Sequence, residues 1–426
     1  MMDRPPPGND GDPLAAPLSD CTVLDFTRIL SGPYATMLLA DLGAEVIKIE
    51  RPGSGDDSRN WGPPFWRGAS TYFAAVNRGK HSLAIDLGSP RGRELVCALG
   101  AKADVLIENF RPGVMQRLGL SYEQLAAVNP ALIYASINGF GSHGPKAEEA
   151  GTEVIVEAET GLMAMMGLPG GPPVRFGVAM VDIATGIALV SGILAALRER
   201  DRLGTGRYLE FPLYSTAFSV LATVIASASV DAVGQEGRWG SGHPSIVPYS
   251  AFEARDGYVV LGALNEAMWS RLCEALSLDR LRNDWRCATN EARVRNRAVV
   301  DAQIARAVGA LTVKAVTDCL RGSGVLVAPV QTAAEAITDP QVDVMGLLDV
   351  VDGVKFVRTP LAQFNKRTLS AAPALGEHSH DVLARLLDLD GAAVDDLVAN
   401  GIVQTEEGGA SASQVDPLAS RGYANT

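Results

Sequence analysis

Cysteine and histidine are scarce in this chain, with five of each among 426 residues. The cysteines are scattered and odd in number, no pair of them has CxxC spacing, and no HExxH pattern occurs. These gaps argue against a disulfide framework and a zinc site, so we expect a protein without a metal. Unpaired cysteines are typical of a reducing compartment, and a cytoplasmic location is the corresponding expectation.

Basic residues are outnumbered, with 37 Lys and Arg against 49 Asp and Glu and a net charge of −12 at pH 7. Nucleic-acid binding requires an excess of positive charge on one face, so no nucleic-acid partner is expected. An anionic small molecule needs only a local basic site and remains compatible with this charge balance. Hydrophobic residues make up 47% of the chain, enough for a large buried core.

A secretory signal is missing, because the first 18 residues are rich in Pro, Asp and Gly and contain no apolar core. Two later apolar stretches, 177–197 and 213–230, raise the alternative of membrane spans. The first contains Asp182 near its start and three glycines, and the second contains several Ser and Thr residues. These features favour two buried helices of a large α/β core, so no membrane partner is expected.

Short strands alternate with helices through the first half of the chain. Helices are predicted at 33–41, at 90–102 and at 121–128, where Ser121 and Gln124 have the spacing of a capping box. The alternation predicts an α/β fold, with an open, mostly parallel, Rossmann-like sheet covered by helices on both faces. Apolar or β-branched runs predict its strands at 22–26, 45–49, 82–87, 104–108, 132–137 and 208–213.

The pattern changes near residue 248, where YSAFEARDGYVVLGAL predicts a hairpin around Asp256-Gly257. Several helices follow, so this part is predicted to be a second, smaller α+β domain at 231–345. The large α/β domain is predicted at 19–230 and is completed by 346–403. Residues 1–18 and 404–426 have the composition of a disordered lead and a disordered tail.

Cationic residues recur directly after predicted strands, with Arg28 after the first, Arg51 after the second and Arg111 after the fourth. Ligands bind beyond the carboxyl ends of strands in open parallel sheets, and Arg at that edge would suit the phosphates of a nucleotide-like cofactor. The alternative is that these are ordinary solvated charges. No GxGxxG follows the first strand and no GxxxxGK[ST] occurs, which argues against a dinucleotide site and a P-loop.

Asp182 is the most informative acid because it lies within the apolar segment GVAMVDIATGIALVSGILAAL. A buried carboxylate is costly unless it is hydrogen-bonded or used in catalysis. The alternative is an N-cap of the following helix, a role worth about 1 kcal/mol. The two roles are compatible, since a helix N-terminus also stabilises an anion.

Several segments resemble family III CoA-transferases, the family of the formyl-CoA and carnitine CoA-transferases. The similarity runs in consistent order over about 19–402. Its main segments are VLDFTRILSGPYATMLLADLGAEVIKIERPGSGD, NRGKHSLAIDL, ADVLIENFRPGVMQRLGL, NPALIYASINGFGSHGP, VDIATGIALVSGILAALRERDRLGTGRYLEFPLYSTA, GHPSIVPYSAFEARDGYVVLGALNE, VLVAPVQTAAEAITDPQ and LGEHS.

The resemblance implies an acyl-CoA:carboxylate CoA-transferase that works without metal, with Asp182 as the nucleophile and a CoA thioester on that Asp as the intermediate. Backbone amides of the glycine loop at Gly240 and Gly242 become candidates for stabilising the oxyanion. An interlocked homodimer is also implied, with an acyl-CoA and a small carboxylic acid as substrates. The implied CoA contacts are Leu30, Ser31, Arg51, Ile85, Asn109, Phe110, Arg117 and Leu118.

The chain departs from the family pattern where Gly88 replaces a Lys that contacts the cofactor in formyl-CoA transferase. Thr152-Glu153 and Glu157-Ala158 also stand where many relatives have Tyr-Asp and Gln-Ala, so the choice of acid cannot be carried over. An intramolecular CoA transferase acting on a diacid stays open. An α-methylacyl-CoA racemase is the other alternative, but this chain has Thr152 where such a racemase has the His that exchanges the proton. A non-catalytic acyl-CoA-binding protein would predict loss of Asp182.

Overall fold

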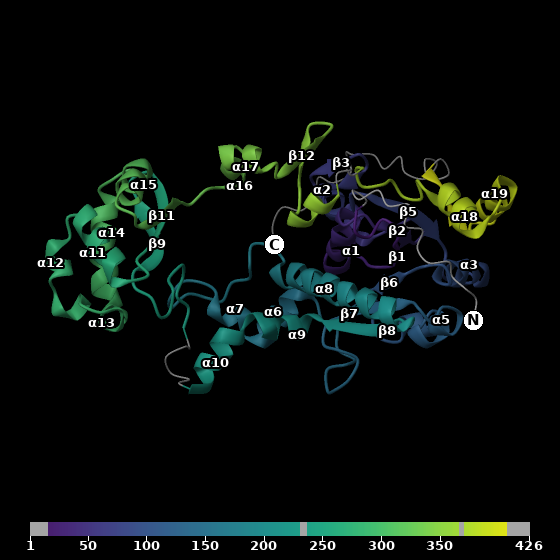
Figure 1. Ribbon diagram of the computed structural model, residues 1–426, viewed down its shortest axis with the longest axis horizontal. Coiled ribbons are helices and arrows are strands. Elements are labelled where there is room, and N and C mark those ends of the chain that lie inside the picture. Colours follow the sequence, from purple (N-terminus) through teal and green to yellow (C-terminus); the bar gives the residue numbers. More distant parts are fainter. Residues whose placement is uncertain (1–15, 231–236, 366–369, 407–426) are drawn as a thin grey trace, which may run out of the picture. The chain divides into compact units, whose positions relative to one another are not determined.

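The computed structural model describes residues 16–230, 237–365 and 370–406 (Figure 1). The chain divides into two compact units. The large unit comprises residues 1–156, 178–219 and 347–426, and the small unit comprises residues 157–177 and 220–346. Most of the predicted disordered lead and tail lies outside the described residues.

A seven-stranded sheet forms the centre of the large unit, with the order β14-β5-β2-β1-β6-β7-β8. All neighbouring strands are parallel except β14, which pairs antiparallel with β5. The mostly parallel α/β fold predicted from the sequence is therefore confirmed. The strands are β1 (Thr22–Asp25), β2 (Glu45–Glu50), β5 (Lys80–Ile85), β6 (Val105–Glu108), β7 (Ile133–Asn138), β8 (Arg207–Pro212) and β14 (Val403–Gln404).

Both faces of this sheet are covered by helices. Alternate residues of the central strands, such as Leu24, Ile47 and Leu83, form an aliphatic core with α3, α5, α18 and α19. Figure 1 shows α1 and α8 beside the sheet, and both helices contact its strands. The helices of the large unit include α1 (Ser31–Asp41), α2 (Thr71–Asn77), α3 (Pro90–Gly100), α4 (Val114–Arg117), α5 (Tyr122–Val128), α8 (Met180–Leu203), α9 (Leu213–Val220), α18 (Ser379–Leu387) and α19 (Gly391–Ala399).

Strand order reverses between β1 and β6. The chain passes from β1 to β2 and β5 on one side, then returns to place β6 against the other side of β1. The loops that follow β1 and β6 therefore diverge and leave a crevice at the carboxyl edge of the sheet, where open α/β sheets bind ligands. Residues 26–30 and 109–113 form these two loops.

Local signals explain several element boundaries. The predicted capping box at Ser121 and Gln124 is present at the start of α5. The strand predicted at 82–87 is instead β5, which begins two residues earlier at Lys80. Lys80 is fully buried, and a rule based on apolar runs does not anticipate a buried lysine inside a strand.

A three-stranded antiparallel sheet, β11-β10-β9, lies at the centre of the small unit. The predicted hairpin is formed by β9 (Tyr249–Ala254) and β10 (Gly257–Gly262), and β11 (Leu326–Pro329) pairs with β10. Buried side chains of α11, α14 and α15 pack on this sheet. The helices assigned to this unit are α7 (Leu162–Met165), α10 (Ala222–Val230), α11 (Glu266–Ala275), α12 (Asp279–Arg282), α13 (Asn290–Arg295), α14 (Arg297–Gly309), α15 (Val313–Gly322), α16 (Ala333–Ala336) and α17 (Pro340–Met345).

The start of the small unit differs from the predicted domain boundary, whereas its end agrees. The return to the large unit at residue 347 lies one residue from the predicted position, whereas residues 157–177 and 220–230 belong to the small unit. The helix α6 (Glu153–Thr160) contains the first of these boundaries. Two short hairpins complete the large unit, namely β3 (Phe65–Trp66) with β4 (Ala69–Ser70), and β12 (Leu348–Val351) with β13 (Val354–Val357).

The helix α8 crosses α1 at a glycine. A Cβ atom added at Gly186 would lie 2.8 Å from the carbonyl oxygen of Ser31 and 3.2 Å from the ring of Tyr34. Glycine is therefore required for the first turn of α1 to approach α8 this closely. By length and composition α8 is also long and apolar enough to cross a membrane. Of its most apolar 18-residue stretch, 44% is buried against the rest of the protein, and the core helix of a soluble protein would have the same properties.

We expect Gly186→Ala to lower the free energy of unfolding by about 1–3 kcal/mol, because the added methyl group overlaps the backbone of α1. Urea unfolding followed by circular dichroism measures the change. The matched control is Gly322→Ala in α15, where an added Cβ meets no atom within 4 Å. That variant should be neutral or slightly more stable, and equal behaviour of the two variants would contradict the proposed contact.

Candidate active site

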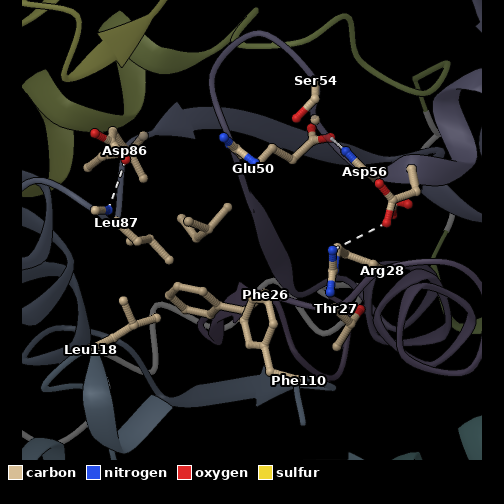
Figure 2. Close-up of a pocket in the computed structure, with 16 residues that line it drawn as sticks. Phe26, Thr27, Arg28, Glu50, Ser54, Asp56, Asp86, Leu87, Phe110 and Leu118 are labelled. Atoms are coloured by element: carbon tan, nitrogen blue, oxygen red, sulfur yellow. Dashed lines mark hydrogen bonds and ion pairs between the residues drawn. The ribbon is translucent and has the colours of Figure 1, made fainter. Parts of the chain in front are cut away.

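A cavity of about 370 Å³ opens at the carboxyl edge of the sheet, beside the crevice between β1 and β6. We call it the edge cavity (Figure 2). Phe26, Phe110 and Leu118 lie on one side of it, and Glu50 and Asp56 lie across from them. The cavity thus has an apolar wall facing a polar wall, as expected for a ligand with both apolar and charged parts.

Most acids of the edge cavity are already neutralised. Glu50 receives two hydrogen bonds from the Arg59 guanidinium, at 2.8 and 2.7 Å. The Asp57 carboxylate pairs with Arg28 at 3.2 Å, a pair drawn as a dashed line in Figure 2. No ion pair within the described part of the chain involves Arg51, so its charge is available to an anionic ligand.

A layer of buried charge lies between the sheet and α1. Lys80 contacts the Asp25 carboxylate at 3.0 Å, and both side chains are fully buried. Burial alone would raise the pKa of Asp25, but Lys80 and Lys48 hold it at about 2. Burial in turn lowers the pKa of Lys80 to about 8. The Thr27 and Thr36 hydroxyls also donate to Asp25, at 2.5 and 2.7 Å. Asp25 thus connects the sheet to the start of the β1 loop through Thr27 and to α1 through Thr36.

A second cavity of about 280 Å³ contains Asp182, and we call it the Asp182 cavity. It shares Arg28 and Phe110 with the edge cavity, so the two are neighbours along the same edge. Asp182 is the third residue of α8, whose N-cap is Ala179, and no side chain caps this helix. The alternative in which Asp182 serves as the N-cap is therefore wrong.

The Asp182 carboxylate has a perturbed acidity. Burial raises its pKa to about 6, and a hydrogen bond with the Ser31 side chain acts in the opposite direction. The first turn of a helix also favours a negative charge. The other charged residues that line this cavity are Arg28, Arg111, Glu149 and Glu153.

The predicted CoA contacts separate into two groups. Four of them line the edge cavity, namely Arg51, Ile85, Phe110 and Leu118. Leu30, Ser31, Asn109 and Phe110 line the Asp182 cavity. Arg117 is exposed on α4 and lines neither cavity.

The predicted glycine loop belongs to the small unit. The Gly240 N–H donates to the carbonyl of Gly167 at 3.0 Å, and the Gly242 N–H donates to the carbonyl of Trp239 at 2.8 Å. Both amides therefore already have acceptors within their own unit. A role in stabilising an oxyanion would require these bonds to be exchanged.

Several residues of the site were not predicted from the sequence. Asp56 and Asp57 reach the edge cavity from the segment after β2, where the sequence analysis singled out only Arg51. Glu108 lines a third cavity, of about 510 Å³, beside the same crevice. Burial raises the pKa of Glu108 to about 7. A glutamate that ends a buried strand is a signal that could have marked this position.

Comparisons with known proteins agree with this fold. The chain belongs to CoA-transferase family III, whose sequence profile matches residues 18–379. The predicted family resemblance is confirmed, and the protein is an enzyme of the CoA-transferase class.

Named relatives extend over most of the chain. The succinyl-CoA:glutarate CoA-transferase of Mus musculus is 40% identical over 412 residues, which cover 94% of this chain and 93% of that protein. The acetyl-CoA:oxalate CoA-transferase of Acetobacter aceti is 37% identical and covers 81% of this chain and 88% of that protein. A solved CAIB/BAIF family protein from Brucella suis has a TM-score of 0.80 and 39% identity, and the match covers 87% of this chain and 100% of that one.

Proposed function

We propose that this enzyme transfers CoA from an acyl-CoA to a small carboxylic acid through a CoA thioester on Asp182. One observation carries the proposal: a partly buried carboxylate at the start of α8 lines a cavity that adjoins the edge cavity. Membership of CoA-transferase family III supports the reaction type. An Asp with a pKa of about 6 is largely ionised at pH 7 and needs no general base.

The proposed chemistry exchanges acyl groups without oxidation or reduction. An Asp182 oxygen attacks the thioester carbonyl, the C–S bond breaks, and a mixed anhydride and CoA thiolate result. The thiolate then attacks the Asp182 carbonyl carbon and releases the first acid, which leaves an aspartyl-CoA thioester. The acceptor carboxylate reverses these steps through a second anhydride, so the new acyl-CoA leaves and Asp182 is regenerated.

We place the CoA nucleotide in the edge cavity. Arg51 would contact a phosphate, because no described ion pair neutralises it. Ile85, Phe110 and Leu118 would supply apolar contacts to the cofactor. The pantetheine arm would pass Arg28 in the loop after β1, because Arg28 lines both cavities.

The acceptor is proposed to be a short dicarboxylic acid. Relatives are named for glutarate, oxalate and mesaconate. Two guanidinium groups line the Asp182 cavity, and Arg28 is already paired with Asp57. No described ion pair involves Arg111, so Arg111 is the group available to the second carboxylate.

We also propose that two copies of the chain associate as an interlocked homodimer. Met180, Ile187 and Leu194 follow one another at intervals of seven residues along α8, which places them on one face of the helix. These three residues are 41%, 50% and 37% exposed in the single chain. An exposed apolar stripe of this kind is typical of a surface that a partner covers.

Incubation with an acyl-CoA should give a CoA adduct on Asp182, detected by peptide mass spectrometry and removed by hydroxylamine. Asp182→Ala should lose the adduct and transfer activity, because no other group replaces the attacking carboxylate. The matched control is Asp201→Ala, at the other end of α8, which should keep both. An active Asp182→Ala variant would overturn the assignment, and a racemase would form no adduct.

The rate of adduct formation should increase with pH through about 6 and level off above it, because only the ionised Asp182 attacks. Ser31→Ala removes the hydrogen bond that lowers this pKa, so the acid limb of kcat/KM for the acyl-CoA should move to higher pH. Ser191→Ala is the control, because within the described residues the Ser191 hydroxyl donates only to the Ile187 carbonyl of α8. An acid limb at the same pH in the unmodified enzyme, Ser31→Ala and Ser191→Ala would contradict the role of Ser31.

Short dicarboxylic acids should exceed monocarboxylic acids of equal chain length in kcat/KM by about tenfold or more, the effect expected of one charge-assisted hydrogen bond. Arg111→Ala should remove most of this preference. Arg91→Ala is the control, because Arg91 pairs with Glu94 on the surface of α3. Equal use of both acid classes by the unmodified enzyme would refute a dicarboxylate site.

A further inference from the structure

The loop after β1 contains an unusual backbone conformation. Ile29 has φ of 72°, in the left-handed region where a β-branched residue is strongly disfavoured. Such strain persists only where the surroundings impose it, and it concentrates at functional sites. Ile29 is two residues before Ser31, which lines the same cavity as Asp182.

Side chains from two other loops impose this conformation. Asn109 accepts the Arg28 N–H at 2.9 Å and donates to the Arg28 carbonyl at 2.8 Å. The Asp56 carboxylate accepts the Ile29 N–H, with its two oxygens at 3.2 and 3.3 Å. The peptide groups on both sides of Arg28 are therefore held from opposite sides of the crevice.

The buried Lys48 side chain holds the Asp56 carboxylate in place. The Lys48 ammonium lies 2.9 Å from Asp56, and both side chains are fully buried. The same ammonium donates to the Thr27 carbonyl at 2.8 Å, so it contacts both the start of the loop and the carboxylate that binds Ile29. Figure 2 shows Thr27, Arg28 and Asp56 around the same edge of the cavity.

We propose that Lys48 and Asp56 are positioning residues for the reaction, which hold Ile29 in its left-handed conformation and so aim the Ser31 hydroxyl at Asp182. The proposal rests on the proposed function of Asp182. Neither residue lines the Asp182 cavity, so their effect on the carboxylate passes through the loop. A purely structural ion pair would stabilise the fold without altering the acidity of Asp182.

The test compares Lys48→Met with Ser31→Ala in the pH dependence of adduct formation from an acyl-CoA. Lys48→Met should move the acid limb to higher pH by about half a pH unit or more, as expected for Ser31→Ala. The first variant would misplace the Ser31 hydroxyl and the second removes it, so both weaken its interaction with the ionised carboxylate. Near pH 6 the rate should fall about twofold or more, because the ionised fraction of Asp182 falls with the shift. The double variant should show no further shift, since both changes act through one contact.

Arg78→Met provides the matched control. Arg78 forms a buried ion pair with Asp41 at the other end of α1, at 2.7 and 2.9 Å. Its removal should lower stability without moving the acid limb. Ile29→Gly introduced into Lys48→Met should restore part of the rate, because glycine adopts positive φ without strain.

The positioning role would be overturned if the acid limb of Lys48→Met lay at the same pH as that of the unmodified enzyme. It would also be overturned if Arg78→Met shifted the acid limb by the same amount. If Lys48→Met does not fold, Asp56→Asn supplies the same comparison, because it removes the charge that Lys48 holds. Absence of an adduct in the unmodified enzyme would instead reject the proposed function itself. An adduct that forms at the same rate in the natural chain and in Lys48→Met rejects only the role of Lys48 and Asp56.

Discussion

Charge buried beneath the β1 loop is the constraint on which the site depends. Lys48 and Lys80 project from neighbouring strands into a space without solvent, where an unpaired ammonium would be very costly. Asp25 and Asp56 neutralise them, and both carboxylates also accept hydrogen bonds from the loop after β1. The need to pair these charges therefore fixes the backbone that separates the two cavities.

Asp182 combines two requirements that oppose each other. In the proposed mechanism the Asp182 carboxylate must be ionised to attack a thioester, yet a partly buried position favours its neutral form. Burial raises its pKa, while the Ser31 bond and the first turn of α8 favour the charged form. The result is an acid that is ionised near neutral pH and lies beside a cavity suited to a cofactor.

Much of the large unit could be predicted because its signals are local. Apolar or β-branched runs place β1, β2 and β6 within one or two residues, and the capping box of α5 is visible in the sequence. The start of β5 was missed because a fully buried Lys80 violates the usual pattern. The assignment of residues 157–177 to the small unit depends on contacts between distant segments, for which no local pattern exists.

The sequence alone determined the family, the α/β class and the place of Asp182 at the start of a long apolar helix, because periodicity and motif order are properties of neighbouring residues. Tertiary structure decided that Ser31 and Asp182 line one cavity, that Arg117 lies outside both cavities and that the Gly240 and Gly242 amides already have acceptors. These outcomes depend on which distant groups meet when the chain packs. Hydrogen bonds and ion pairs require distances of a few ångströms, and spacing along the chain does not specify them.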